Sequence, residues 1–207
     1  MTDQQVLLAI DLQNDFMPGG ALAVPHGDEV IAPINRLAAH FPHMVLTQDW
    51  HPATHRSFAV NHAGRAPFDS FEMPYGPQVL WPSHCVQGTP GAALDARLQR
   101  RHARMLIRKG HRPEVDSYSA FVEADRVTST GLAGYLRECG VEHVFCCGLA
   151  TDFCVAFSAL DARAAGFAVT IIEDACRAID LDGSLEQAWT RLTDAGVARC
   201  VSNQLLD

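Results

Sequence analysis

The chain has 207 residues, a length at which one hydrophobic core still serves a whole protein, so we expect a single domain spanning residues 1–207. Its 48% hydrophobic and 19% charged residues are typical of globular proteins and exclude a disordered chain or a collagen-like repeat. Asp and Glu number 24 against 16 Lys and Arg, and the resulting net charge of −8 disfavours nucleic acid or an anionic membrane as a partner.

Short runs of β-branched and apolar residues alternate along the chain with segments of helical spacing. In chain order, the pattern predicts a strand at 6–10, a helix at 29–39, a strand at 44–47, a helix at 94–101, a strand at 105–108, a helix at 131–139, a strand at 143–147, a helix at 152–165, a strand at 168–172, a helix at 184–195 and a weaker strand at 198–202. Gly140 and Gly166 follow two of these helices, and we interpret them as C-terminal stops. Strands that alternate with helices form parallel sheets with helices on both faces, so the sequence predicts an α/β fold with six strands.

The segment 49–91 follows neither pattern and is rich in Pro, Gly, His and aromatic residues. Irregular stretches of this length are uncommon in compact domains unless they perform a function. We therefore expect this segment to contribute to a functional site.

Chemically active side chains follow the predicted strands. In open α/β sheets the ligand crevice lies beyond the carboxyl ends of the strands. Asp11 follows the first strand, Asp49 and His51 follow the second, Lys109 the third, and Cys154 lies after the fourth in the turn GLATDFC. The sequence therefore predicts that an acid, a pair of metal-type ligands, a lysine and a cysteine converge on one edge of the sheet.

Cys154 is the candidate nucleophile. We expect it near the start of a helix, with Thr151 as the N-cap and Asp152 in the first turn. Unpaired backbone N–H groups and the positive end of the helix dipole would favour a thiolate there. The alternative is a buried, inert cysteine, which is our interpretation of Cys139, Cys146, Cys147, Cys176 and Cys200.

Lys109 and Asp11 have two interpretations each. A lysine at a strand end is by default solvated, whereas one that points into the crevice would stabilise a neighbouring thiolate and polarise a substrate. Asp11 would either cap the turn after its strand or, partly desolvated, accept a proton and then return it. Of their neighbours, we interpret Arg108 as solvated and Asp15 as structural.

Asp49 and His51 stand two positions apart, on the same side of an extended segment, which suits two ligands of one divalent ion. His84 in WPSHC and His55 in HPATH offer further ligands from the same long segment. A set of one carboxylate and two or three imidazoles is therefore predicted.

The seven cysteines form no CxxC pair, and free thiols in a reducing compartment fit them best. The N-terminus MTDQQ lacks the basic residue of a signal peptide, and no apolar run approaches the ~18 residues of a membrane span. We therefore expect a cytoplasmic protein.

Six motifs carry a resemblance that covers nearly the whole chain: IDLQNDF, DWHPATH, LWPSHCVQGTPG, KG, DSYSAF and GLATDFCV. In this order they resemble the nicotinamidase/pyrazinamidase branch of the isochorismatase-like cysteine hydrolases. The resemblance implies a Rossmann-like three-layer sandwich with a six-stranded parallel sheet. It also implies hydrolysis of nicotinamide to nicotinate and ammonia, a step of NAD salvage, with pyrazinamide as a second expected substrate.

The family's functional residues match positions of this chain one by one. The resemblance implies a catalytic set of Asp11, Lys109 and Cys154, metal ligands Asp49, His51 and His84, an oxyanion hole formed by the amides of Ala150 and Cys154, and a substrate pocket with Phe16, Trp81, Tyr118 and Leu149. His55 matches a position that ligates the metal in some members only, so it is either an extra ligand or a rim residue. A cis peptide bond is expected at Leu149–Ala150. Zinc is the expected metal, with iron and manganese left open.

The expected reaction is covalent catalysis through a thioester, with the metal orienting the pyridine ring of a small-molecule substrate. A related cysteine amidohydrolase that acts on a carbamoyl or ureido compound is the first alternative, and Phe16 and Trp81 argue against it because a flat aromatic clamp suits a pyridine ring. A metal-binding or redox-sensing protein that uses Cys146 and Cys147 is the second alternative, although neighbouring cysteines in a strand point to opposite faces. A homo-oligomer is left open.

Overall fold

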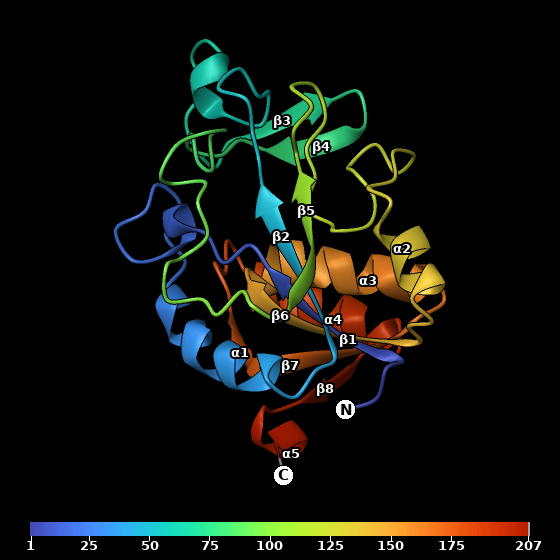
Figure 1. Cartoon of the computed structure of the whole chain (residues 1–207). Helices are drawn as coiled ribbons and strands as arrows, with labels where there is room; N and C mark the ends of the chain where they lie inside the picture. Colours follow the sequence, from blue (N-terminus) through green and yellow to red (C-terminus); the bar gives the residue numbers. More distant parts are fainter. Residues whose placement is uncertain (207) are drawn as a thin grey trace.

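A parallel β-sheet forms the centre of the molecule (Figure 1). The computed structural model describes residues 1–206. Within this range the sheet has six strands in the order β5-β2-β1-β6-β7-β8, and every neighbouring pair runs parallel. The strands are β1 (Gln5–Ile10), β2 (His43–Asp49), β5 (Ala103–Lys109), β6 (His143–Leu149), β7 (Ala168–Arg177) and β8 (Ala198–Cys200). All six predicted strands are confirmed.

Helices flank the sheet on both faces. They are α1 (Ile31–Ala38), α2 (Leu132–Glu138), α3 (Ala156–Ala164), α4 (Ser184–Asp194) and α5 (Asn203–Leu206), with short 3₁₀ turns η1 (Asn14–Phe16), η2 (Gly27–Val30) and η3 (Ala59–Asn61) and the π-helical turn η4 (Thr151–Val155). The chain moves from β1 through α1 to β2 in one direction and from β6 through α3 to β7 in the other. Right-handed crossovers therefore place α1 and α3 on opposite faces, as Figure 1 shows. This confirms the predicted three-layer α/β architecture.

The predicted glycine stops are confirmed, since Gly140 and Gly166 follow α2 and α3 with φ angles of 71° and 95°. The predicted helix at 94–101 is wrong. Leu94 forms an antiparallel bridge with Gln13, and the Asp95 N–H donates to the Leu12 carbonyl at 2.8 Å. These contacts hold the segment irregular beside the chain that leaves β1, although Leu94 and Leu98 have helical spacing and are both buried.

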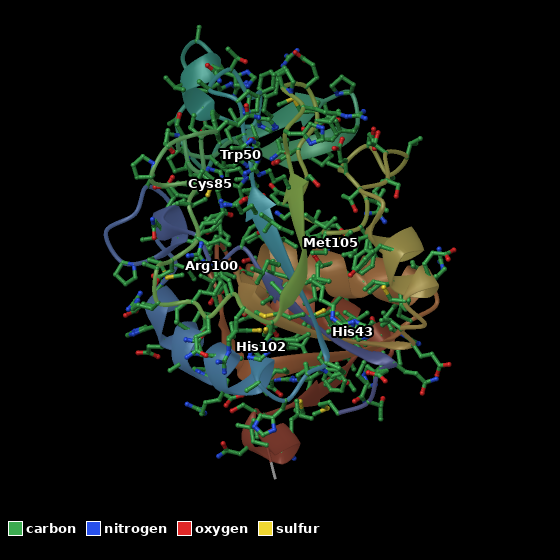
Figure 2. All side chains as sticks on the ribbon, viewed as in Figure 1. His43, Trp50, Cys85, Arg100, His102 and Met105 are labelled. Carbon is green, nitrogen blue, oxygen red and sulfur yellow. The ribbon has the colours of Figure 1, made fainter. Side chains whose placement is uncertain are left out.

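The connection between β2 and β5 lies at the carboxyl edge of the sheet. It contains a hairpin that the sequence did not predict, formed by β3 (Ser70–Met73) and β4 (Gly76–Val79). Figure 2 shows Trp50 and Cys85 on the side of this hairpin and His43 at the opposite end of β2. The predicted irregular segment therefore covers the edge where a ligand crevice is expected. Among residues 1–206, no helix has the length and hydropathy needed to cross a bilayer.

Candidate active site

Three of the predicted residues meet at the carboxyl edge of the sheet. Lys109 Nζ lies 2.8 Å from Asp11 Oδ2 and 3.3 Å from Cys154 Sγ, and the three side chains are buried. Lys109 is fully buried, so its interpretation as a solvated surface residue is wrong.

The backbone of Gly148 brings the two central strands close enough for this meeting. β1 and β6 are neighbours whose connections lead to opposite faces of the sheet, which is where open α/β sheets form their crevice. Gly148 has a φ of 114°, and a Cβ atom there would collide with the backbone of Ile10. The site therefore requires glycine at this position, because any side chain would push the end of β6 away from Asp11.

Asp11 has one oxygen that is held and one that is available. Its Oδ1 accepts the hydroxyl hydrogen of Thr47 at 2.5 Å, and its own N–H donates to the Thr47 hydroxyl at 3.0 Å. Its Oδ2 is near Lys109, but within residues 1–206 it accepts no hydrogen bond of good geometry. An oxygen in this state can receive a proton from a neighbouring group.

Burial and charge set the protonation states. Burial raises the pKa of the Cys154 thiol well above its usual value, the Asp11 and Asp49 carboxylates add to this effect, and Lys109 opposes it. Burial also raises the pKa of Asp11, against the attraction of Lys109. For Lys109, burial alone would lower the pKa, but Asp11 and Asp49 outweigh it and hold the pKa well above the usual lysine value. These effects favour a neutral Cys154 thiol beside a charged Lys109. The helix terminus alone had predicted a thiolate.

The turn that carries Cys154 differs in detail from the sequence prediction. Residues Thr151–Val155 form one π-helical turn, in which the Ala150 carbonyl accepts the N–H groups of both Phe153 and Val155 at 3.1 Å. Ala150 is the N-cap residue, so the prediction of Thr151 as the cap is wrong. The wider π turn shifts the start of the regular helix to Ala156. The peptide bond between Leu149 and Ala150 is cis, as the resemblance implied.

The predicted metal ligands converge beside the cysteine. Asp49 Oδ2 lies 3.6 Å from His51 Nε2 and 3.8 Å from His84 Nε2. Four-coordinate zinc with bonds of about 2.1 Å separates its ligand atoms by about 3.4 Å, so the spacing is suitable. His51 Nδ1 donates to the Gly110 carbonyl at 2.9 Å and His84 Nδ1 to the Pro82 carbonyl at 2.8 Å. Since a carbonyl oxygen can only accept, Nδ1 carries the hydrogen in both rings, and the neutral form of each ring presents the Nε2 lone pair that a cation requires.

His55 is buried next to this cluster but is occupied by other contacts. Its Nδ1 accepts the Ser57 N–H at 3.2 Å, and its Nε2 lies 3.3 Å from the Val115 carbonyl oxygen. Burial lowers the pKa of His55 to about 4, so the ring is neutral at pH 7. His51, His55 and Asp116 form a second group whose potential ligand atoms lie within 4.8 Å of one another.

A cavity with aromatic walls connects the cysteine with the metal ligands. Its lining residues are Phe16, Leu22, Asp49, His51, Trp81, His84, Asp116, Tyr118, Ala150, Phe153, Cys154 and Ile179. The Tyr118 hydroxyl accepts the Trp81 indole N–H at 3.0 Å and the Gln78 amide N–H at 2.9 Å. The Gln78 amide also donates to Asp116 Oδ2 at 2.7 Å. This network fixes the orientation of the Trp81 ring.

The cavity contains residues that the sequence reasoning missed: Leu22, Asp116, Phe153 and Ile179. Asp116 and Phe153 lie within the motifs DSYSAF and TDFC, so their motif positions were the available signal, whereas Leu22 and Ile179 gave none. Leu149 is fully buried and is not among the residues that line this cavity. The Asp15 carboxylate accepts the Cys85 N–H at 2.7 Å next to His84, in agreement with its structural interpretation.

The chain is similar to known proteins over nearly its whole length. The isochorismatase domain model matches residues 5–204. The chain is 55% identical over 200 residues to the nicotinamidase of Acinetobacter baylyi, covering 97% of this chain and 94% of that protein. The solved structure of an Acinetobacter baumanii nicotinamidase/pyrazinamidase superposes with a TM-score of 0.99 at 53% identity and covers 100% of both chains.

Two further solved structures contain ligands. PnC1 of L. infantum in complex with nicotinate has a TM-score of 0.86 and 42% identity, covering 98% of this chain and 96% of that one. The pyrazinamidase of Pyrococcus horikoshii in complex with zinc has a TM-score of 0.78 and 36% identity, covering 96% and 99%. The sequence match over nearly the full length and the shared fold lead to one assignment. This chain belongs to the isochorismatase domain family.

Proposed function

We propose that this protein is a nicotinamidase, a metal-dependent cysteine amidohydrolase that converts nicotinamide to nicotinate and ammonia. The observation that carries the proposal is the contact of Lys109 with both Asp11 and Cys154, directly beside the Asp49, His51 and His84 cluster. The 55% identity to the Acinetobacter baylyi nicotinamidase supports the choice of substrate. Pyrazinamide, a similar flat heteroaromatic amide, is proposed as a second substrate.

In the proposed reaction, Asp11 Oδ2 accepts the thiol proton of Cys154, and the sulfur attacks the carboxamide carbon. Lys109 stabilises the sulfur while it carries negative charge, which offsets part of the effect of burial on the thiol pKa. The amides of Ala150 and Cys154 donate to the oxyanion of the tetrahedral intermediate, a contribution of about 3 kcal/mol for each donor in comparable sites. Asp11 then returns its proton to the amide nitrogen, the C–N bond breaks, and ammonia leaves a thioester on Cys154.

In the second half of the proposed reaction, Asp11 again accepts a proton and then donates it. A water molecule loses a proton to Asp11 and attacks the thioester carbon. The C–S bond breaks, the proton returns from Asp11 to the sulfur, and nicotinic acid is released, whose carboxyl proton passes to water to give nicotinate. One buried carboxylate therefore moves a proton in both directions, which suits a group whose pKa is raised by burial.

Asp49, His51 and His84 would hold the metal, with the ring of His55 as a neighbour tied to Ser57 and Val115. When bound, a divalent cation supplies a positive charge and an open coordination position for the pyridine nitrogen. Phe16 and Trp81 contribute to the walls of the cavity and would contact the ring of the substrate. Zinc is the proposed metal because one carboxylate and two imidazoles form a suitable ligand set. A reducing, cytoplasmic environment would keep the proposed nucleophile in its thiol form.

The test is ammonia release from nicotinamide by the purified protein, measured as isolated, after chelation, and after zinc, iron or manganese is added back. The same assay with Cys154→Ala checks the nucleophile, and Cys200→Ala is the control because Cys200 does not line the cavity. We expect turnover that falls to the uncatalysed background in Cys154→Ala and is unchanged in Cys200→Ala. Turnover of an N-carbamoyl compound without turnover of nicotinamide would reject the proposed substrate.

A further inference from the structure

The cavity has one wall that comes from neither a catalytic residue nor the aromatic clamp. Ile179 lines the same cavity as Cys154 and lies in the connection 178–183 between β7 and α4. This connection is irregular, and two of its non-glycine residues, Asp180 and Asp182, have positive φ angles of 56° and 50°. Such backbone conformations persist only where other contacts hold them.

Those contacts come from Asp152, two residues before the cysteine. Asp152 Oδ1 accepts the N–H of Ile179 at 3.1 Å, and its Oδ2 accepts the N–H of Asp180 at 2.8 Å. Oδ2 also accepts the hydroxyl hydrogen of Ser184 at 2.5 Å. The Asp152 side chain is buried, and its three donors are neutral groups of the connection and of the first residue of α4. A carboxylate in this position holds the connection directly against the turn that carries Cys154.

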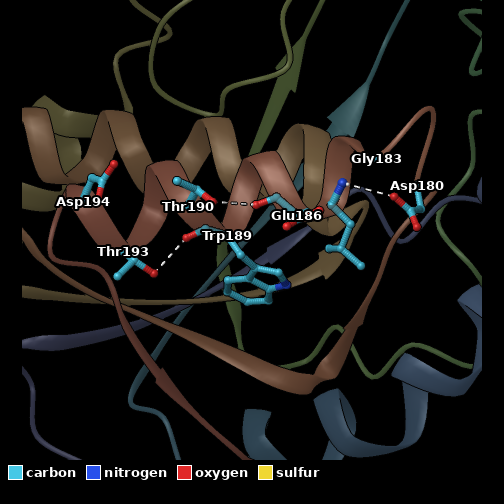
Figure 3. A pocket seen from close by; sticks show the side chains of 8 residues that line it. Asp180, Gly183, Glu186, Trp189, Thr190, Thr193 and Asp194 are labelled. Carbon is cyan, nitrogen blue, oxygen red and sulfur yellow. Dashed lines mark hydrogen bonds between the residues drawn. The ribbon is translucent and has the colours of Figure 1, made fainter.

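The far end of the connection makes further contacts with the first turn of α4. Figure 3 shows Asp180 beside the first turn of α4, where its Oδ1 accepts the N–H of Leu185 at 3.3 Å. The Ser184 hydroxyl oxygen accepts the N–H of Leu181 at 2.9 Å. The segment between these contacts and Asp152 therefore has little freedom, and the position of the Ile179 side chain depends on Asp152.

We propose that Asp152 is a positioning residue that sets the Ile179 wall of the substrate cavity and so the placement of the aromatic ring relative to Cys154. This inference rests on the proposed function. The ring of a flat amide must be held on all sides for its carbonyl carbon to face the sulfur, and the Ile179 wall is formed by the connection instead of the β2–β5 segment. Asp152 itself does not line the cavity, so it acts through Ile179 and not through contact with the substrate.

A role in stability alone makes a different prediction. A variant that merely unfolds in part would have fewer active molecules, so kcat would fall while KM stayed unchanged. A displaced wall would instead raise KM for nicotinamide because the bound ring is held less well, with a smaller change in kcat. The split between the two constants therefore distinguishes positioning from stability.

The experiment compares Asp152→Ala, Ile179→Ala and the double variant by steady-state ammonia release from nicotinamide. We expect each single variant to raise KM about tenfold, and the double variant to raise it no further than either single one, because both changes act on the same wall. Asp152→Asn, which keeps the shape but places an NH₂ group opposite backbone N–H donors, is measured as well in case Asp152→Ala does not fold. Asp174→Ala is the matched control, because Asp174 binds the N–H and hydroxyl of Ser202 in the same way and does not line the cavity.

Multiplying effects in the double variant, or an unchanged KM in Asp152→Asn and Asp152→Ala, would overturn the positioning role. So would an equal rise in KM for the Asp174→Ala control. Wild-type protein that releases no ammonia from nicotinamide would instead reject the proposed function itself, which separates the two failures. Hydrogen exchange of the Ile179 and Asp180 amides gives a second readout. Faster exchange in Asp152→Asn supports the proposal that Asp152 holds the connection, and unchanged protection contradicts it.

Discussion

The His51 ring lies directly against the backbone of Gly110, whose carbonyl oxygen accepts the Nδ1 hydrogen at 2.9 Å. Gly110 has a φ of 64°, and a Cβ atom there would overlap the Cε1 atom of the ring. The residue after the buried lysine thus sets both the tautomer and the position of a predicted metal ligand.

Gly110→Ala is expected to lower metal affinity by at least about tenfold, because the new methyl group displaces His51 from Asp49 and His84. Gly64→Ala is the matched control, since Gly64 has a similar φ of 74° but a Cβ atom there meets nothing within 4 Å. Both variants share the backbone strain, and only one moves the ligand. Metal content after dialysis against a graded chelator measures the difference, and equal metal loss in the two variants would contradict it.

Asp11→Asn should reduce kcat about 10³-fold while the protein keeps its fold. The amide has nearly the same shape and its oxygen can still accept from Thr47, but it cannot take the thiol proton. Single-turnover ammonia release measures the chemical step, and circular dichroism with metal analysis verifies that the site is intact. Activity within tenfold of the wild type would show that another group deprotonates Cys154.

Tyr118→Phe should raise KM for nicotinamide about tenfold with a smaller effect on kcat. Without the hydroxyl, the buried indole N–H of Trp81 loses its acceptor, which costs about 1–3 kcal/mol unless the ring turns. A turned ring no longer forms the same wall. Steady-state kinetics measure the effect, and Tyr135→Phe on α2 is the control outside the cavity. If KM is unchanged in Tyr118→Phe, the hydroxyl does not orient Trp81.

His55 should make the metal-free protein less stable as the pH falls. The pKa of His55 is lowered to about 4 in the folded protein from 6.5 in the unfolded chain, so between these values the unfolded state binds more protons. His55 therefore leaves the free energy of unfolding unchanged above pH 6.5. Below that, the free energy of unfolding falls as the pH approaches 4, by up to about 3 kcal/mol. His55→Gln should flatten this part of the curve of unfolding free energy against pH, measured by urea denaturation after chelation. A slope in His55→Gln equal to that of the wild type would contradict this prediction.

The sheet and its reacting residues were predictable because buried parallel strands consist of continuous apolar runs and the residues after them must lie at one edge. The hairpin β3–β4 was not, since its strands have four residues each, and Gly76 and Pro77 break any alternation. The helix at 94–101 failed for the opposite reason. Its leucine spacing is helical, but Asp95 and Leu94 form tertiary contacts with the chain after β1 instead.

Within the site, sequence patterns indicated residue types but not protonation or orientation. The thiol of Cys154 is close to a helix terminus, as predicted, yet burial and two carboxylates raise its pKa, and those carboxylates come from distant strands. The wall residue Ile179 was missed because an isolated isoleucine in a connection has no pattern around it. Only the fold shows that Asp152 brings this connection to the cavity.

Some of the groups that would recognise the ring come from a different part of the chain than the groups that would move protons. Asp11 and Cys154 follow strands of the central sheet and Lys109 is the last residue of β5, whereas Trp81 and His84 belong to the connection between β2 and β5. Replacing that connection, in evolution or by design, could therefore change which amide is accepted without moving Asp11, Lys109 and Cys154. A modular origin of this kind would let one hydrolytic core be adapted to a succession of small amides.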